Sequence, residues 1–364
     1  MEKLNITWLD IFVTERCNLR CKYCFHNKRP VDMPEETVDR AIEFLGPMFG
    51  KTVTFNLFGG EPFMRPDLCF SFMNKLKEKF PECKFHISTN GTNFNQDLVR
   101  ALRSYNSMLQ ISYDGIDQEE LRGQSKLVEE NIPKFIKEFS PLNPAIRLTY
   151  TRDTVGNIYQ SFLKCVDLGV KKFTHQAQLT NEWISTDFEI YRGQLEKIHD
   201  YMDDHKDIYV HFCDCEKITK QKDNAICSAG KTLIALTANG DLYPCHRMIK
   251  MDKFKIGNVF EGTLNRGGFA VMGILGCRDC VALPTCHPCI AANYEYTGSF
   301  MKPLRATCEI NKIEHIMSEM RYTRLNKDIL DSQDMIRSMV LVLTDLRNSN
   351  NEILEVLRNE KPIN

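Results

Sequence analysis

The chain carries three closely spaced cysteines near its start, Cys17, Cys21 and Cys24. Residues 6–13, just before them, are apolar, β-branched and aromatic, which predicts a buried strand with the cysteines on the loop that follows it. Three thiolates on one loop can bind three irons of a four-iron cluster and leave the fourth iron open to another ligand. A structural zinc site is the alternative interpretation, although zinc prefers four ligands, commonly as paired C-x-x-C units.

A second short segment, Gly59-Gly60-Glu61-Pro62, follows another apolar run at residues 52–58. Glycines let a ligand approach the backbone closely, and the Glu61 carboxylate can accept hydrogen bonds from an ammonium group. A plain turn before a helix is the alternative interpretation of the same four residues.

The cysteine spacing C-x-x-x-C-x-x-C, with Tyr23 before the last cysteine, resembles the hallmark of the radical S-adenosylmethionine (SAM) family. The resemblance implies that this loop holds a [4Fe-4S] cluster, that SAM chelates the open iron, and that one electron cleaves SAM to a 5′-deoxyadenosyl radical. It also implies that the Gly-Gly-Glu-Pro segment binds the amino group of SAM. Further contacts to SAM are implied for the following residues: Tyr23, Ser88, Asn90, Ser112, Arg122 and the backbone of Leu179.

Strand and helix patterns alternate through the first two hundred residues. Strands are predicted at residues 6–13, 52–58, 84–88, 108–113, 145–150 and 170–177. Helices are predicted between them, near residues 34–45, 66–80, 118–139 and 157–168, with one more capped by Asn95. This alternation predicts an α/β fold with a parallel sheet and right-handed crossovers. Six units are too few for an eight-stranded barrel, so we expect a partial (β/α)6 TIM barrel over residues 1–210, which the resemblance also implies, with its chemistry at the carboxyl ends of the strands.

Beyond residue 210 the chain carries a second group of cysteines: Cys213, Cys215, Cys227, Cys245, Cys277, Cys280, Cys286, Cys289 and Cys308. Their order resembles the SPASM extension of radical SAM enzymes, which houses two auxiliary [4Fe-4S] clusters. The pattern departs from the family in one place, because two residues instead of three separate Cys286 from Cys289. A pair of zinc ribbons on the same cysteines is the alternative.

The connectivity of that family implies two ligand sets. One cluster would be bound by Cys227, Cys245 and Cys289 together with Cys215, or alternatively Cys213. The other cluster would be bound by Cys277, Cys280, Cys286 and Cys308. Three clusters are therefore expected in all, two of them in a SPASM domain at residues 211–315, which a helical tail at residues 316–364 follows.

Two smaller predictions concern the remaining cysteines and the segment between Cys227 and Cys245. Residues 232–243 predict a β-hairpin with a type I′ turn at Asn239-Gly240. Three cysteines stand among apolar residues of predicted helices and strands and are interpreted as buried thiols of no catalytic role: Cys69, Cys83 and Cys165.

Composition narrows the class of protein. The formal net charge is −1, which gives no indication of a nucleic acid or an anionic membrane as a partner. Glu2 and Asp10 interrupt any secretory signal at the start, and the apolar run at residues 339–343 is too short to span a bilayer. The 15 cysteines, an odd number, therefore indicate metal binding in a reducing cytoplasm instead of a disulfide framework.

Two features bear on the substrate through the resemblance. His246 follows Cys245, where sulfatase-maturing relatives carry an aspartate as base, and residues 291–298 look like those of maturases that act on cysteine-rich peptides. The implied function is a radical SAM peptide maturase that installs an oxidative crosslink in a cysteine-containing, ribosomally made precursor peptide. A thioether is preferred, and a C–C bond is the other possibility.

The implied partners are the precursor peptide and a reductant such as flavodoxin or ferredoxin. The first strand begins almost at Met1, so recognition of a leader would use the barrel rim, the cysteine-rich domain or a separate leader-binding protein. One alternative is a sulfatase-maturase-like oxidation of a protein cysteine or serine to formylglycine, which His246 disfavours. A non-catalytic iron–sulfur scaffold is another.

Overall fold

A computed structural model gives the structure, and it describes residues 5–211, 227–266, 277, 280–283, 285–325 and 340. The chain divides into two compact units. The first holds Met1–Tyr150, Gln160–Gln178 and Ser228–Gly273, and the second holds Thr151–Tyr159, Leu179–Cys227 and Ile274–Asn364. The domain boundaries expected at residues 210 and 315 stay predictions.

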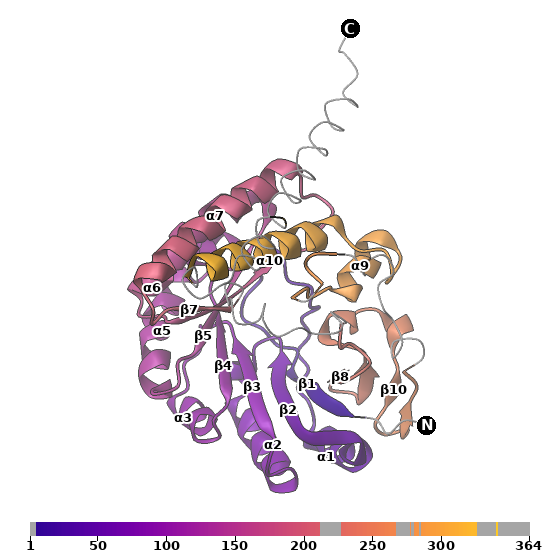
Figure 1. Ribbon diagram of the computed structural model, residues 1–364. Helices are drawn as coiled ribbons and strands as arrows, with labels where there is room; N and C mark the ends of the chain where they lie inside the picture. The colour runs from indigo at the N-terminus through magenta and orange to yellow at the C-terminus, as the bar shows by residue number, and fades with distance from the viewer. Residues whose placement is uncertain are drawn as a thin grey trace. The chain divides into compact units, whose positions relative to one another are not determined.

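A parallel sheet forms the centre of the first unit. Its strands, in spatial order, are β1 (Ile6–Thr14), β2 (Phe49–Gly59), β3 (Lys84–Thr89), β4 (Met108–Ser112), β5 (Ala145–Tyr150) and β6 (Lys172–Ala177). Each strand pairs in parallel with the next one along the chain, and Figure 1 shows β1 to β5 side by side. Within the described part of the chain no hydrogen bonds join β6 back to β1, so the barrel is open. The prediction of an α/β partial barrel is confirmed.

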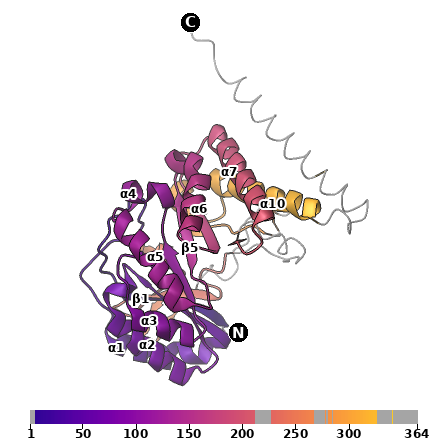
Figure 2. The same ribbon diagram turned by 90° about the vertical axis from the view of Figure 1, so that its left-hand side faces the viewer.

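Helices between the strands cover the outer face of this sheet, which is turned toward the viewer in Figure 2. They are α1 (Glu35–Leu45), α2 (Pro66–Lys79), α3 (Gln96–Ser104) and α5 (Ser125–Phe139), and α6 (Ile158–Asp167) precedes β6. Helix α3 begins as predicted, because the Asn95 side chain accepts a hydrogen bond of 2.8 Å from the backbone N–H of Leu98. Such a cap satisfies one of the N–H groups that the first turn of a helix leaves free.

The predicted single helix at residues 118–139 is wrong, because the structure divides it into α4 (Gln118–Leu121) and α5. Gly123 and Gln124 adopt left-handed conformations, with φ of 82° and 58°, and a helix cannot continue through them. The break places Arg122 at the end of α4, where its side chain is free to turn toward the carboxyl ends of the strands.

The two faces of the sheet differ in polarity, as strand β5 illustrates. Ile146, Leu148 and Tyr150 are buried, with exposed fractions of 1%, 5% and 1%, whereas Arg147 and Thr149 alternate with them on the opposite face and are half-buried. The interior of a parallel barrel is ordinarily filled by Val, Ile and Leu. A polar interior therefore indicates a surface that receives a ligand.

Four further strands extend the sheet beyond β1. Strand β8 (Leu233–Leu236) pairs in parallel with β1, and β9 (Asp241–Tyr243), β10 (Gly257–Asn258) and β11 (Thr263–Leu264) follow in antiparallel order among the described residues. The sequence predicted the hairpin of β8 and β9 but not its place beside β1, which depends on a contact between residues over two hundred positions apart.

The type I′ turn predicted for this hairpin is wrong. A type I′ turn needs positive φ at both central residues, and only Gly240, with φ of 84°, has it, whereas Asn239 does not. The backbone N–H of Gly240 instead donates to the carbonyl of Thr237 at 3.0 Å, so Gly240 closes a longer connection.

The second unit contains helices α7 (Ser185–Asp204), α9 (Ile290–Thr297) and α10 (Arg305–Leu325) and the short strand β7 (Tyr209–Val210). Helix α10 packs along α7, and Arg321 donates to Asp203 at 2.9 Å while Tyr191 donates to Glu314 at 2.7 Å. The expected helical tail lies outside the described residues apart from the end of α10 and Val340.

In the ranges that the structure covers, no helix has both the length and the apolarity that a membrane span requires. The three cysteines interpreted as buried thiols are indeed buried: Cys69, Cys83 and Cys165.

Candidate active site

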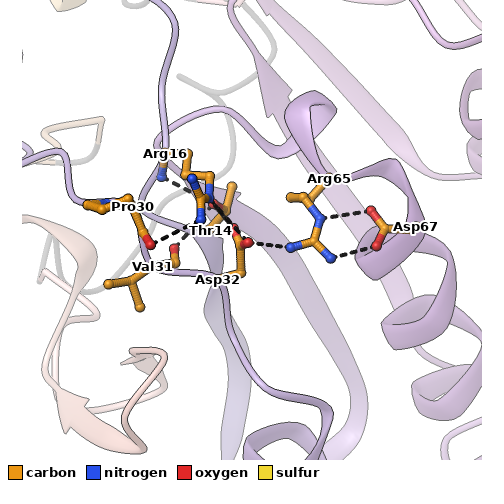
Figure 3. Close-up of polar contacts among 7 residues, drawn as sticks. All are labelled: Thr14, Arg16, Pro30, Val31, Asp32, Arg65 and Asp67. Carbon is orange, nitrogen blue, oxygen red and sulfur yellow. Dashed lines mark hydrogen bonds and ion pairs between the residues drawn. The ribbon is translucent and has the colours of Figure 1, made fainter.

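The loop that carries Cys17, Cys21 and Cys24 is held closed at its base by the network in Figure 3. The Thr14 hydroxyl donates to Asp32 at 2.6 Å, and the Arg16 Nε donates to both oxygens of that carboxylate at 3.2 Å. Arg65, at the start of α2, binds Asp32 from the other side and pairs with Asp67 at 2.6 Å. Partial burial acts to raise the pKa of Asp32, but the bonds from Thr14, Arg65 and Arg16 outweigh it and the pKa lies below its ordinary value.

The Gly-Gly-Glu-Pro segment lies directly against the start of this loop. The N–H of Gly60 donates to the Thr14 carbonyl, and the N–H of Glu61 donates to the Arg16 carbonyl, each at 2.7 Å. A Cβ atom at Gly59 would lie 2.0 Å from the Thr14 carbonyl oxygen, and one at Gly60 would lie 2.0 Å from the Arg16 carbonyl oxygen. Real side chains cannot approach so closely, so both glycines are required by the contact between the two loops.

The Glu61 carboxylate joins the ends of β2 and β3. The residue is 1% exposed, and its carboxylate accepts hydrogen bonds from the Phe63 N–H at 3.0 Å, the Thr89 hydroxyl at 2.7 Å and the Asn90 N–H at 2.6 Å. Burial raises the pKa of Glu61 to about 7, because these three bonds offset only part of the cost of removing the charge from water.

Asn90, a predicted site residue, reaches the first cysteine. Its Nδ2 lies 3.9 Å from the sulfur of Cys17 and donates to Asn18 at 2.9 Å, and Asn18 in turn donates to Thr92 at 2.8 Å. N–H groups directed at a cysteine sulfur stabilise the thiolate that a cluster requires.

Tyr23 and Arg122, two further predicted residues, meet at Asp114, which follows β4 and is 1% exposed. Asp114 accepts hydrogen bonds from the Tyr23 hydroxyl, from the Arg122 Nε at 2.8 Å and from the Thr149 N–H at 2.8 Å. The Arg122 guanidinium also lies over the Tyr23 ring, 5.1 Å from its centroid, and 4.0 Å from the sulfur of Cys21. Asp114 is not among the predicted site residues, although an aspartate directly after a predicted strand could have indicated it.

The remaining residues predicted to contact SAM form few side-chain hydrogen bonds within the described part of the chain. The Ser88 hydroxyl donates to Gln110 at 3.3 Å inside the barrel, and Ser112 is half-buried at the end of β4, opposite Arg147 of β5. Pro62 is buried and opens the short 3-10 helix η2 (Pro62–Met64). Leu179 begins a segment of the second unit, so its place relative to these residues is not described.

The three loop cysteines fit a bound cluster. None of them forms a disulfide, Cys17 and Cys21 are half-buried, and Cys24 is exposed. Two of the three sulfurs have an N–H donor from Asn90 or Arg122 beside them. Over the described ranges, no three His, Cys, Asp or Glu side chains converge to hold a single metal ion. The thiolates of a four-iron cluster lie farther apart than the ligands of a single metal ion, because each thiolate binds its own iron.

Four cysteines of the second group lie close to one another in the second unit: Cys277, Cys280, Cys286 and Cys308. Burial, together with the neighbouring thiols of Cys280, Cys308 and Cys277, raises the pKa of Cys286 to about 12. These four are the residues expected to share one cluster.

The other expected ligand set spans both units and stays a prediction. Cys289 caps α9, with its sulfur 3.4 Å from the Ala292 N–H, and belongs to the second unit with Cys227. Cys245 belongs to the first unit. Cys213 and Cys215 lie outside the described residues.

His246 is tied to a buried aspartate that sequence reasoning missed. Asp10, in the middle of β1, is 0% exposed and accepts hydrogen bonds from the Trp8 ring at 2.8 Å, from Asn56 at 2.7 Å and from the His246 Nδ1 at 2.7 Å. Burial acts to raise the pKa of Asp10, but His246, Asn56 and Trp8 outweigh it and the pKa is lowered. The imidazole packs beside Phe25, 5.7 Å between ring centroids, directly after the cysteine loop. An aspartate within an apolar predicted strand is the sequence feature that could have indicated Asp10 as a site residue.

Residues 11–174 match the model of the radical SAM superfamily. The subtilosin biosynthesis protein AlbA of Bacillus subtilis is 25% identical over 271 residues, which cover 69% of this chain and 57% of that protein. The uncharacterized protein MJ0907 of Methanocaldococcus jannaschii is 30% identical over 112 residues, which cover 30% of this chain and 39% of that protein. The chain thus spans about half the length of these two relatives. A cysteine-type anaerobic sulfatase-maturating enzyme of Clostridium novyi is 25% identical over 300 residues, which cover 69% of this chain and 76% of that protein.

Solved structures share the fold. The structure of anSMEcpe with bound AdoMet superposes with a TM-score of 0.73 at 17% identity, covering 89% of this chain and 100% of that one. Streptococcus suis SuiB bound to the precursor peptide SuiA superposes with a TM-score of 0.61 at 19% identity, covering 84% and 76%. With the cysteine loop, the open parallel barrel and the family match in agreement, residues 11–174 of this chain form a radical SAM domain.

Proposed function

We propose that the chain is a radical SAM enzyme that installs an oxidative crosslink in a ribosomally made peptide, preferably a thioether from a cysteine sulfur. One observation carries the proposal: the cysteine loop is fixed against the Gly-Gly-Glu-Pro segment, and N–H donors of Asn90 and Arg122 face the sulfurs of Cys17 and Cys21. The choice of a peptide substrate is supported by AlbA, a bacteriocin biosynthesis protein, and by SuiB, which was solved with its precursor peptide.

In this proposal the cofactors are SAM and a [4Fe-4S] cluster on Cys17, Cys21 and Cys24. When bound, they supply a one-electron cleavage whose 5′-deoxyadenosyl radical can take a hydrogen atom from carbon. Residues of the chain would position these cofactors. Glu61 fixes the loops after β2 and β3, and Asp114 fixes Arg122 and Tyr23 beside Cys21.

Two auxiliary clusters complete the proposal, which makes three in all. Formation of the new bond removes one hydrogen atom, one proton and one electron from the peptide, so the electron needs an acceptor close to the substrate. We assign that task to clusters held by the SPASM cysteines, with Cys277, Cys280, Cys286 and Cys308 as one ligand set. Cys227, Cys245, Cys289 and Cys215 would form the other. The reductant would be a flavodoxin or ferredoxin, and the leader of the peptide would be recognised by the barrel rim, the cysteine-rich domain or a separate protein.

The proposal is tested on the product. The reconstituted chain is incubated anaerobically with SAM, dithionite and candidate short peptides that contain cysteine, and mass spectrometry is run with and without iodoacetamide. A thioether removes two hydrogens and one alkylatable thiol for each bond, and replacing that cysteine by serine in the peptide abolishes the change.

Other products would separate the alternatives. Loss of two hydrogens with every thiol retained would replace the thioether by a C–C bond and keep the peptide-maturase proposal. An aldehyde at a cysteine or serine would instead favour oxidation to formylglycine, which similarity to the Clostridium novyi enzyme supports as the second candidate. SAM cleavage with no change in any peptide would contradict both.

A further inference from the structure

A row of hydrogen-bonded side chains crosses the inner face of the first three strands. In the strand pairing, Asp10 of β1 lies beside Asn56 of β2, and Asn56 lies beside His86 of β3. The Asn56 Nδ2 donates to Asp10 at 2.7 Å, and the Asn56 Oδ1 lies 2.7 Å from the His86 Nδ1. Both Asp10 and Asn56 are buried. The proposed reaction assigns no task to this row.

The row fixes the position of the proton on the His86 ring. A carboxylate only accepts hydrogen bonds, so Asn56 turns its NH2 group to Asp10 and its carbonyl oxygen to His86. That oxygen needs a donor, so the His86 Nδ1 carries the proton. Burial, opposed by the charge of Asp10 and aided by that of Arg147, lowers the pKa of His86 to about 4, which leaves the ring neutral near pH 7. The Nε2 of such a ring is a hydrogen-bond acceptor.

The Nε2 of His86 faces the barrel interior without a partner of its own. His86 alternates along β3 with Phe85 and Ile87, which are buried, and its side chain is half-buried on the opposite, inner face. Its Nε2 forms no hydrogen bond to a residue that the structure describes. The Trp8 ring lies beside it, 5.6 Å between centroids, and directs its own N–H at Asp10. His86 and Trp8 therefore present one acceptor and one apolar ring.

The nearby charges and the depth of His86 narrow the class of ligand. Asp10 and Arg147 act on the ring with opposite signs, so neither a cation nor an anion is favoured there. A hydroxyl or a carboxamide can donate to Nε2 without bringing a charge into a half-buried site. His86 lies three residues before Thr89, the end of β3, which is about 10 Å below the barrel rim. A side chain directed inward reaches this depth more readily than a peptide backbone.

We propose that the Nε2 of His86 accepts a hydrogen bond from a neutral hydroxyl or carboxamide side chain of the substrate peptide and so selects that side chain. Asn56 is the positioning residue, because it fixes the tautomer of His86, and Asp10 fixes Asn56. The inference rests on the proposed function for the peptide as ligand. A general base works best with a pKa near the working pH, so the low pKa of His86 favours recognition over proton transfer.

The test is peptide selection without turnover. A display library of random peptides, each with one cysteine, is selected at saturating SAM without a reductant on the reconstituted full chain, on His86→Phe and on His205→Phe. His205 is an exposed histidine at the end of α7 and serves as the matched control. The wild type and the control should enrich a hydroxyl or carboxamide residue at one position relative to the cysteine. His86→Phe should lose this enrichment.

Affinities of single peptides measure the size of the effect. A selected peptide is compared with a version in which the enriched residue is replaced by an apolar one of similar shape, such as phenylalanine for tyrosine, methionine for glutamine or valine for threonine. The polar peptide should bind the wild type roughly 3- to 20-fold more tightly than the apolar one. The ratio should fall to about one in His86→Phe. His86→Gln should recover part of it, because a carboxamide can donate to Asn56 and still offer an oxygen.

A further variant tests the tautomer and does not depend on the folding of His86→Phe. Asn56→Leu keeps the imidazole of His86 but releases its proton from Nδ1, so Nε2 can become a donor. Aspartate and glutamate, which accept only, should then be enriched beside the residues that the wild type selects. Thermal unfolding of each variant shows that the selected protein is folded. An unchanged preference in Asn56→Leu would overturn the role of Asn56.

Three outcomes would overturn the subsite at His86. The wild type could bind peptides with no preference for a hydroxyl or carboxamide, the preference could survive in folded His86→Phe, or it could disappear equally in His205→Phe. Retention of no peptide by any of the proteins would contradict the peptide substrate, and with it the subsite. Because the selection needs no product, these outcomes stay distinct from failure of the proposed reaction, in which peptides bind and remain unmodified.

Discussion

Asp114 is the single residue on which the inner end of the site most depends. It and Arg122 are both buried, so Asp114→Asn leaves a buried guanidinium without its anion. We expect the free energy of unfolding, measured by urea titration, to fall by about 3–5 kcal/mol. Asp67→Asn is the matched control: its carboxylate is 62% exposed and pairs with Arg65, so its loss should cost less than about 1 kcal/mol. Equal losses in the two variants would contradict the importance of the buried pair.

Glu61 should give the chain a specific pH dependence of stability. Its pKa is raised by burial from 4.5 to about 7, so between these values the folded state binds more protons at Glu61 than the unfolded state does. The stability that Glu61 contributes is therefore full below pH 4.5 and is lost as the pH rises through 7, by up to about 3 kcal/mol.

The measurement for this second prediction is the difference in the free energy of unfolding between the wild type and Glu61→Gln across the pH range. Glutamine does not titrate, so other groups cancel in the difference. The curve should fall with rising pH. A flat curve would mean that Glu61 has an ordinary pKa in the folded chain.

At the scale of elements, the contact between the cysteine loop and the end of β2 leaves no room for a side chain. Gly60→Ala would place its Cβ 2.0 Å from the Arg16 carbonyl oxygen, so the two loops must separate. We expect a loss of about 1–3 kcal/mol in the free energy of unfolding and faster proteolysis within residues 15–31. Gly193→Ala in α7, which has nothing within 4 Å of its Cβ, is the control and should be neutral or stabilising. Unchanged proteolysis in Gly60→Ala would contradict the proposed close contact between the cysteine loop and the end of β2.

Elements with strong local patterns were predictable from the sequence, and elements defined by distant contacts were not. The strands β1 to β6 are short apolar runs between clear helices, so their order and parallel pairing followed from the alternation. The break before α5 depended on left-handed conformations at Gly123 and Gln124, which no apolar period reveals. The place of β8 beside β1 depended on pairing across the chain.

The site shows the same division. The spacing of the loop cysteines and the Gly-Gly-Glu-Pro segment are local patterns, and the structure brings these two segments together. The partners that fix them come from elsewhere: Asp114 for Arg122, Thr89 for Glu61 and Asp10 for His246. Such pairs form only once the sheet has folded, so the spacing of residues in the sequence does not predict them.

At the scale of the whole molecule, the number of clusters sets the iron content. The three four-iron clusters of the proposal would give roughly twelve irons per chain after anaerobic reconstitution. Replacing the three loop cysteines by alanine should remove about a third of the iron, and Cys280→Ala should remove about another third while leaving reductive SAM cleavage intact. Zinc in place of iron at the second cysteine group, in protein made under strict anaerobiosis, would rule out the SPASM assignment.

In the proposed function, SAM is cleaved at the loop of Cys17, Cys21 and Cys24. The most direct test is the yield of 5′-deoxyadenosine with SAM and dithionite in Cys24→Ala compared with Cys83→Ala. Cys24 is exposed and Cys83 is buried, so the first substitution disturbs packing less than the second. We expect no 5′-deoxyadenosine from Cys24→Ala and a near wild-type yield from Cys83→Ala. A wild-type yield from Cys24→Ala would contradict it.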